Sequence, residues 1–288
     1  MDVMKPATRM VAICLGVIAA VAVILFALSQ YLRVDYPVPC QVYGAHPVYA
    51  GEEALTMNQE LFRIPYIRCK AGKHHIEEIS FKEFPQLIMT DVDMPDEEEG
   101  DDTRTDYYTL KSVSISLMED EEPFPGLQEP ITLTTATIFY DDDTQQTFDI
   151  GKIVLYPQAD EAEQVLENNG DTYKDNGAYR ASYRTKTDLT LQAFECGPEL
   201  KDPQLKVNKK EFSDVKDQLI KKDYQLDFAL TIGEQPFTFY APTIRVTCKT
   251  SNGRSYTQTL GSFDADIDMY EGPSFFETLS YLKGRGVI

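Results

Sequence analysis

Carboxylates at alternate positions near the C-terminus are the first residues whose type and spacing suggest chemistry. The run Asp264-Ala265-Asp266-Ile267-Asp268 resembles the opening of a calcium loop, in which alternating carboxylates supply hard oxygen ligands. An EF-hand loop beginning at Asp264 would need Gly in place of Met269 and Glu in place of Phe275. The favoured interpretation is therefore a strand or loop with one solvated acidic face, and weak Ca²⁺ association at Asp264, Asp266 and Asp268 is the alternative.

Histidines are the next candidate ligands, and the chain has only His46, His74 and His75. His74 and His75 follow Cys69 by five and six residues. Adjacent side chains on an extended strand point to opposite faces, so only one of the two could share a site with Cys69. We interpret them as part of an exposed loop.

Catalytic motifs give no further candidates. The sequence contains no G-x-S-x-G, H-E-x-x-H, G-x-x-x-x-G-K-[ST] or G-x-G-x-x-G motif, so the usual parts for nucleophilic, zinc and phosphate chemistry are missing. We therefore predict that the protein is not an enzyme and needs no cofactor, apart from the weak Ca²⁺ association described above.

Four cysteines follow the N-terminal hydrophobic segment, which itself contains Cys14: Cys40, Cys69, Cys196 and Cys248. Their spacings do not resemble the paired C-x-x-C of a zinc site, so disulfides are the favoured use. Four cysteines allow three connectivities, and sequence alone does not choose among them. The two-domain plan given below favours Cys40–Cys69 and Cys196–Cys248.

Charge excludes one class of partner. The chain has 27 Lys and Arg against 47 Asp and Glu, for a net charge of -20. Such a surface repels phosphate backbones, so we predict no binding of nucleic acid.

The N-terminal segment predicts the compartment. Met10–Leu28 contains no charged residue and follows Lys5 and Arg9. At 1.5 Å per residue such a helix spans about 28 Å, close to the thickness of a bilayer core. The preceding positive charges predict a cytoplasmic N-terminus and an exported remainder. A cleavable signal peptide is the alternative, because Ala27-Leu28-Ser29 fits a cleavage site before Gln30.

Comparison of the chain with itself indicates an internal duplication. Phe62–Cys69 aligns with Leu189–Cys196, and Thr147–Gly151 aligns with Thr257–Gly261, with other short matches in the same order between them. Between the two copies lies a polar stretch with the turn signals Asn169-Gly170 and Asn176-Gly177.

Within each copy, apolar residues recur mostly at every second position, which is typical of strands with one buried face. The predicted strands are 111–117, 131–140, 147–156, 187–191, 224–232, 237–247 and 255–263. Asp141-Asp142-Asp143 and Ser251-Asn252-Gly253 predict hairpin turns at equivalent places. Short helices are predicted near residues 210–221, 160–168 and 274–283.

These patterns predict a mainly β protein with one transmembrane helix and two tandem, duplicated β-sandwich domains of immunoglobulin-like type with minor helices. Two α+β domains are the alternative, because Phe212, Val215 and Leu219 fall on one helical face. The predicted plan is a cytoplasmic N-terminus (1–9), a transmembrane helix (10–28), a stem (29–60), repeat 1 (61–157), a linker (158–186), repeat 2 (187–270) and a tail with a short helix (271–288).

The predicted function follows from this plan. We expect a non-enzymatic binding or structural protein, held in the cell membrane through residues 10–28, that presents two acidic β-domains to a protein or cell-surface partner. A sensory or regulatory subunit of a membrane complex and a cation-dependent adhesin are the alternatives. If the segment is cleaved, the protein is instead secreted.

Overall fold

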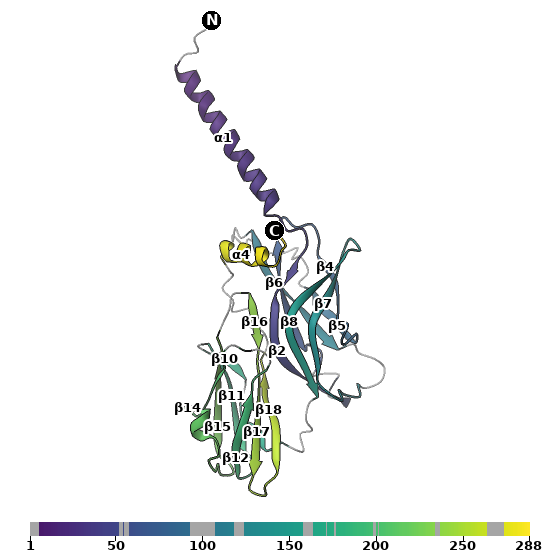
Figure 1. The fold of residues 1–288 in the computed structure, drawn as a ribbon, viewed down its shortest axis with the longest axis vertical. Coiled ribbons are helices and arrows are strands. Elements are labelled where there is room, and N and C mark those ends of the chain that lie inside the picture. Colours follow the sequence, from purple (N-terminus) through teal and green to yellow (C-terminus); the bar gives the residue numbers. More distant parts are fainter. Residues whose placement is uncertain are drawn as a thin grey trace.

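A computed structural model describes residues 6–51, 54, 58–92, 107–117, 124–157, 164–170, 172–175, 177–197, 200, 202–233, 237–263 and 274–288. The fold is mainly β, with one long N-terminal helix, α1 (Pro6–Tyr31) (Figure 1). Within α1, residues 13–28 are exposed, and Ile13–Tyr31 is long and apolar enough to cross a membrane. A signal sequence meets the same test, so α1 alone does not distinguish the two predictions.

Two sheets form the first hydrophobic core. One has the order β1-β3-β6-β5, with every neighbouring pair antiparallel. The other has the order β16-β2-β8-β7-β4, in which β2 lies parallel to both β16 and β8. The bounds are β1 (Val38–Pro39), β2 (Gln41–Val48), β3 (Phe62–Cys69), β4 (Ile76–Ser80), β5 (Leu87–Val92), β6 (Tyr108–Leu117), β7 (Ile131–Tyr140), β8 (Gln145–Pro157) and β16 (Thr238–Ala241). Ile64 and Val113 from the first sheet and Leu133 and Ile153 from the second belong to the same buried cluster.

The second core is built from two further sheets. One has the order β10-β11-β15-β13-β14, with β9 also paired to β11, and the other has the order β12-β17-β18. The bounds are β9 (Leu166–Asn168), β10 (Tyr173–Asp175), β11 (Ala178–Thr185), β12 (Leu189–Glu195), β13 (Gln204–Val207), β14 (Lys210–Glu211), α3 (Phe212–Val215), β15 (Gln225–Thr231), β17 (Thr243–Thr250) and β18 (Ser255–Ser262). Their buried apolar residues form a separate cluster.

The strand order of the first core recurs in the second. The order β3-β6-β5 corresponds to β11-β15-β13, and β4-β7-β8 corresponds to β12-β17-β18. The corresponding hairpins even share a cross-strand hydroxyl pair, Thr137–Thr147 at 3.1 Å and Thr247–Thr257 at 3.0 Å. The second strands of these hairpins align in the same way in the sequence, where Thr147–Gly151 matches Thr257–Gly261. The sequence comparison aligned β3 with β12, however, whereas the strand order sets β3 against β11.

One strand from the second half of the chain completes a sheet of the first core. β16 is the edge strand beside β2, and Phe237, Phe239 and Ala241 are buried in the first cluster. Two residues further on, the Thr243 hydroxyl donates to the Ala45 carbonyl. The second half of the chain therefore contributes one strand to the first core.

The C-terminal helix α4 (Phe275–Gly284) also packs on the first core. It begins with a capping box in which Ser274 and Glu277 satisfy each other's backbone N–H groups. Leu282 is fully buried, and Tyr281 stacks on Phe237 with ring centroids 4.7 Å apart. The predicted helix at 274–283 is confirmed, and the tail that contains it belongs to the first core.

The structure differs from four of the predicted segments. The expected stem, 29–60, contains β1 and β2, which belong to the first core. The expected linker, 158–186, contains β9, β10 and β11 of the second core. The helix predicted at 210–221 is limited to α3, which is followed by a left-handed residue at Asp217 (φ 61°). In the predicted helix at 160–168, residues 166–168 form a strand instead.

Candidate functional site

The turn between β7 and β8 positions two carboxylates beside a histidine. Asp143 has a left-handed φ of 62°, which allows the tight Asp141-Asp142-Asp143 turn, and its N–H donates to the Tyr140 carbonyl at 3.0 Å. The Asp142 carboxylate accepts from both the backbone N–H and the hydroxyl of Thr144, at 3.2 and 2.6 Å. These bonds fix the direction of the Asp142 side chain.

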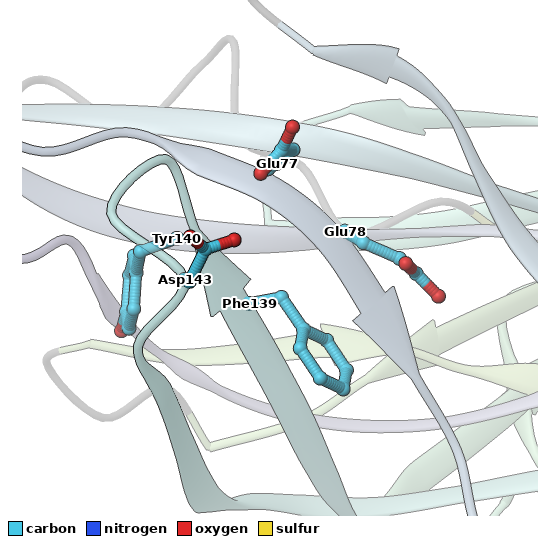
Figure 2. A pocket seen from close by; sticks show the side chains of 5 residues that line it. All are labelled: Glu77, Glu78, Phe139, Tyr140 and Asp143. Atoms are coloured by element: carbon cyan, nitrogen blue, oxygen red, sulfur yellow. The ribbon is translucent and has the colours of Figure 1, made fainter.

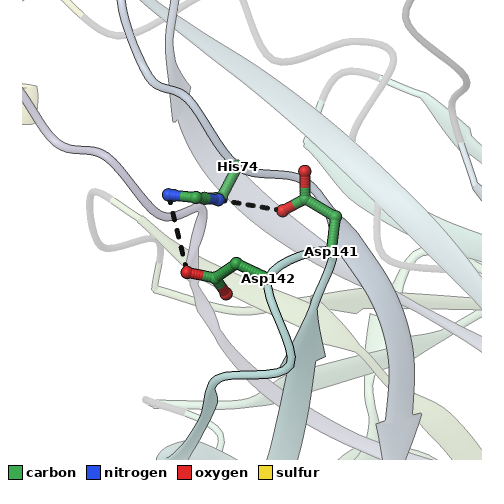
Figure 3. A group of neighbouring side chains, drawn as sticks. All are labelled: His74, Asp141 and Asp142. Atoms are coloured by element: carbon green, nitrogen blue, oxygen red, sulfur yellow. Dashed lines mark hydrogen bonds and ion pairs between the residues drawn. The ribbon is translucent and has the colours of Figure 1, made fainter.

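His74 lies between the two carboxylates, as Figure 3 shows. Its Nδ1 is 3.0 Å from Asp141 Oδ1, and its Nε2 is 3.6 Å from Asp142 Oδ2. The backbone N–H of His74 donates to the Asp35 carbonyl at 3.1 Å, which fixes this residue against the segment that follows α1. The other oxygen of the same carboxylate, Asp141 Oδ2, lies 3.0 Å from Nδ1 of His75. We call His74, Asp141 and Asp142 the His–Asp cluster.

Tyr36 closes the His–Asp cluster on one side. Its ring stacks on the His74 imidazole at 4.5 Å and 12°, and its hydroxyl donates to Asp142 Oδ2 at 2.8 Å. Tyr36 is five residues beyond the end of α1. The cluster therefore connects three separate segments: the residues after α1, the β3–β4 connection and the β7–β8 turn.

Electrostatics favour ionised carboxylates in the cluster. The hydrogen bond from the Thr144 hydroxyl, supported by the one from Tyr36, lowers the pKa of Asp142 to about 2. Partial desolvation raises the pKa of Asp141, but hydrogen bonds from His74 and from the His75 backbone outweigh it, so the pKa is lowered overall. Both carboxylates are therefore ionised at neutral pH, one on each side of the His74 ring.

The three side chains of the His–Asp cluster could hold a divalent cation. Each offers one ligand atom, and these atoms lie within 4.8 Å of one another. An imidazole nitrogen with carboxylate oxygens suits Zn²⁺ or a similar transition metal better than Ca²⁺, which takes oxygen ligands only. The cluster therefore has the donor atoms for a transition-metal ion.

An acidic pocket of about 430 Å³ lies beside the turn (Figure 2). Glu77 and Glu78 come from β4, Phe139 and Tyr140 from β7, and Asp143 from the turn itself. This lining complements a cationic group. The carboxylates attract the cation by charge, and the face of an aromatic ring offers it a cation–π contact.

Replacing Asp142 with Asn tests the electrostatics of the cluster. Because the pKa of Asp142 is lower in the folded protein than in the unfolded chain, its charge stabilises the fold above the unfolded value of about 3.8, and this stabilisation disappears as the pH falls toward 2. We expect Asp142→Asn to lower the Tm at pH 7 and the difference from wild type to vanish near the folded pKa of about 2. Scanning calorimetry of both proteins across this pH range measures the difference in Tm.

Asp143→Asn is the matched control, since it removes the same charge from the same turn and Asn tolerates the left-handed backbone at that position. We expect it to leave the pH dependence of the Tm close to that of wild type. A gap between wild type and Asp142→Asn that stays constant with pH would contradict the ionisation argument.

The other sequence-predicted sites fare differently. Asp264, Asp266 and Asp268 lie outside the described residues. Cys40, Cys69, Cys196 and Cys248 are all buried and form no disulfide in this structure. His74 and His75 do lie in a connection between strands. Their aspartate partner is not apparent in the sequence, because Asp141 is 67 residues from His74.

Strand register explains why the predicted disulfides do not form. Cys40 lies opposite Pro65, its N–H donating to that carbonyl at 2.8 Å, and Pro65 is four residues from Cys69 along β3. At about 3.3 Å per residue the two cysteines are about 13 Å apart, whereas a disulfide needs Cα atoms within about 7 Å.

The second pair is separated in the same way. Cys248 lies opposite Leu191, while Cys196 follows Glu195, which lies opposite Arg245. Burial raises the pKa of Cys196 to about 11 and that of Cys248 to about 12, which makes both thiols unreactive. Cysteine usage therefore gives no support to an oxidising compartment.

Comparison with known proteins leaves the family open. No family model matches the sequence, and no curated protein matches it. The solved structures that resemble it include the human desmocollin-1 ectodomain, at 9% identity over 82% of this chain and 59% of that chain, with a TM-score of 0.23. They also include titin Ig tandem domains, at 10% identity over 79% of this chain and 96% of that chain, with a TM-score of 0.15. At these TM-scores neither likeness carries a functional argument, and the chain spans only about three fifths of the desmocollin ectodomain.

Proposed function

We propose that the chain is a membrane-anchored extracytoplasmic binding protein, with a structural or recognition role and no catalytic one. The observation that carries this proposal is α1, whose residues 13–28 are apolar and exposed while the rest of the chain folds around two buried cores. A helix with apolar side chains all around it needs an apolar surrounding, and a bilayer supplies one.

Strand order supports the architecture of the exported part. The orders β1-β3-β6-β5 and β4-β7-β8 correspond to the ABED and CFG sheets of an immunoglobulin-like sandwich, and the second core repeats the orders B-E-D and C-F-G. We propose two such sandwiches that arose by duplication. Sandwiches of this kind commonly present the loops at their ends to partners.

Alkaline carbonate extraction of the full-length protein, combined with N-terminal sequencing, tests the anchor. We expect the protein to stay with the membrane and to start near Met1. Release into the soluble fraction with a start near Gln30 would overturn the anchor and identify a secreted protein. Protease added to intact cells should remove the β cores if these face outward, and protection of both cores would contradict the orientation.

Cation-dependent binding is a second candidate function, favoured by the His–Asp cluster. Titration calorimetry of the full chain with Zn²⁺ at neutral pH should show binding, and His74→Gln should weaken it by about tenfold or more, because one of three ligands is lost. His75→Gln is the matched control, since His75 is the neighbouring histidine but not one of the three ligands. Absence of binding at millimolar Zn²⁺ would rule out this candidate.

A further inference from the structure

Aromatic side chains fix the end of α1 against the first core. The Tyr107 hydroxyl donates to the Ser29 carbonyl at 2.8 Å, and the Tyr108 hydroxyl donates to the Leu32 carbonyl at 2.5 Å. Ser29 lies in the last turn of α1, where backbone carbonyls have no partner further along the helix, and Leu32 directly follows that turn. The two tyrosines, at the start of β6, thus hold the point at which the chain leaves α1.

The same tyrosines hold the start of α4. Phe275 stacks on Tyr108 with centroids 5.9 Å apart and contacts Tyr107 edge to face at 6.5 Å. Figure 1 shows α4 lying beside the end of α1. The ring of Phe276 follows, 5.6 Å from that of Phe275. A continuous chain of contacts therefore runs from the end of α1 to Phe276.

Phe276 points away from the protein. Its side chain is 79% exposed, the most of any large apolar residue that the structure describes. Thr278 and Leu282 face the core, so Phe276, Ser280 and Lys283 lie on the opposite face of α4. Folding of this chain leaves Phe276 without an apolar contact surface over most of its ring.

We propose that α4 lies in the interfacial zone of the bilayer that α1 spans, with Phe276 inserted at the boundary between headgroups and acyl chains. This inference rests on the membrane anchor proposed above. Tyr31, 69% exposed at the end of the span, marks the depth at which aromatic rings gather in membranes. An aromatic ring and a lysine on one helix face suit that zone, because the ring is buried while the ammonium group reaches the phosphates.

The consequence is a second attachment to the membrane. A single transmembrane helix lets the exported part tilt freely relative to the bilayer. Contacts of both α1 and α4 with the bilayer would restrict this tilt. The first core would then stay at the lipid surface, and the second core, which lies on the far side of the first in Figure 1, would be held away from it.

The absence of Trp from the sequence provides a direct test. Phe276→Trp places a single tryptophan on α4, at a site exposed enough to accept it without disturbing the fold. The full-length variant is reconstituted into phosphatidylcholine vesicles with or without brominated acyl chains, which quench only tryptophans that contact them. We expect Trp emission to shift to the blue and to fall by roughly half in brominated vesicles, since interfacial helices bury their apolar face at this depth.

Tyr224→Trp is the matched control, because Tyr224 is similarly aromatic, is 52% exposed and precedes β15 in the second core. It should show no bromine quenching. An unquenched Phe276→Trp variant in vesicles that resist carbonate extraction would overturn the inference while leaving the anchor intact. Blue-shifted emission without quenching would also overturn it, since the ring would then contact protein, such as a second copy of the chain. Loss of the protein from the vesicles on carbonate treatment would instead overturn the anchor.

Discussion

Replacement of Phe237 by Ala is expected to lower the free energy of unfolding of the first core by about 3–5 kcal/mol, the range for truncation of a buried phenylalanine. Phe237 is 1% exposed and lies in the first cluster, although the chain reaches it only after most strands of the second core. Its ring stacks on Tyr281 of α4. Truncation therefore leaves a cavity and also removes the surface on which α4 packs.

The measurement is urea denaturation of the full chain in detergent, followed by circular dichroism. Hydrogen exchange of the peptides from β16 and α4 should rise together, because both lose the same contact. Backbone strain does not complicate the comparison: Phe237 has a φ of 56°, and Phe and Ala are both penalised in that region.

Phe276→Ala is the matched control for this substitution. It makes the same change, from Phe to Ala, at a position on α4 that is 79% exposed. Substitutions at such exposed positions change stability by about 0.5 kcal/mol or less. If Phe237→Ala also changed stability by less than about 1 kcal/mol, the burial of β16 in the first core would be wrong.

Local signals predicted the hairpins well. The strands expected at 131–140 and 255–263 correspond to β7 (Ile131–Tyr140) and β18 (Ser255–Ser262), and both turns lie where the Asp-rich and Asn-Gly signals placed them. These elements depend on neighbours a few residues away, so their pattern is complete within a short window.

Elements that depend on distant partners were missed. β2 is paired in parallel with β8 and β16, and its buried face contains Gly44 and His46 between Val42 and Val48, so the apolar alternation that identified the other strands is interrupted. The segment expected as a strand over 237–247 is divided at Pro242, where the chain passes from one core to the other. The sequence contains no local sign that a strand of the second half completes a sheet of the first.

The candidate site was beyond sequence reasoning for the same reason. His74 and Asp141 meet only because β4 pairs with β7, and that register follows from the packing of the whole first core. For the disulfides, spacing along the chain suggested a proximity that the strand register does not provide. Cysteines that looked well spaced along the chain are held about four strand positions apart by the register.

The register between β2 and β8 leads to the second large effect. Gly151 lies opposite Val42, has a φ of 88°, and a Cβ at this position would be 2.5 Å from the Val42 carbonyl oxygen. The backbone of β2 cannot yield without losing its parallel pairing. We expect Gly151→Ala to reduce the free energy of unfolding of the first core by about 2–5 kcal/mol, from the left-handed φ and the overlap together.

Gly261→Ala is the natural comparison, because the sequence alignment sets Gly261 against Gly151. Gly261 has no left-handed φ, and the nearest atom to an added Cβ is a side-chain methyl carbon of Thr172, at 2.8 Å, which can rotate away. We expect a change within about 1 kcal/mol of wild type. Equal stability of the two variants in urea denaturation would contradict the parallel register.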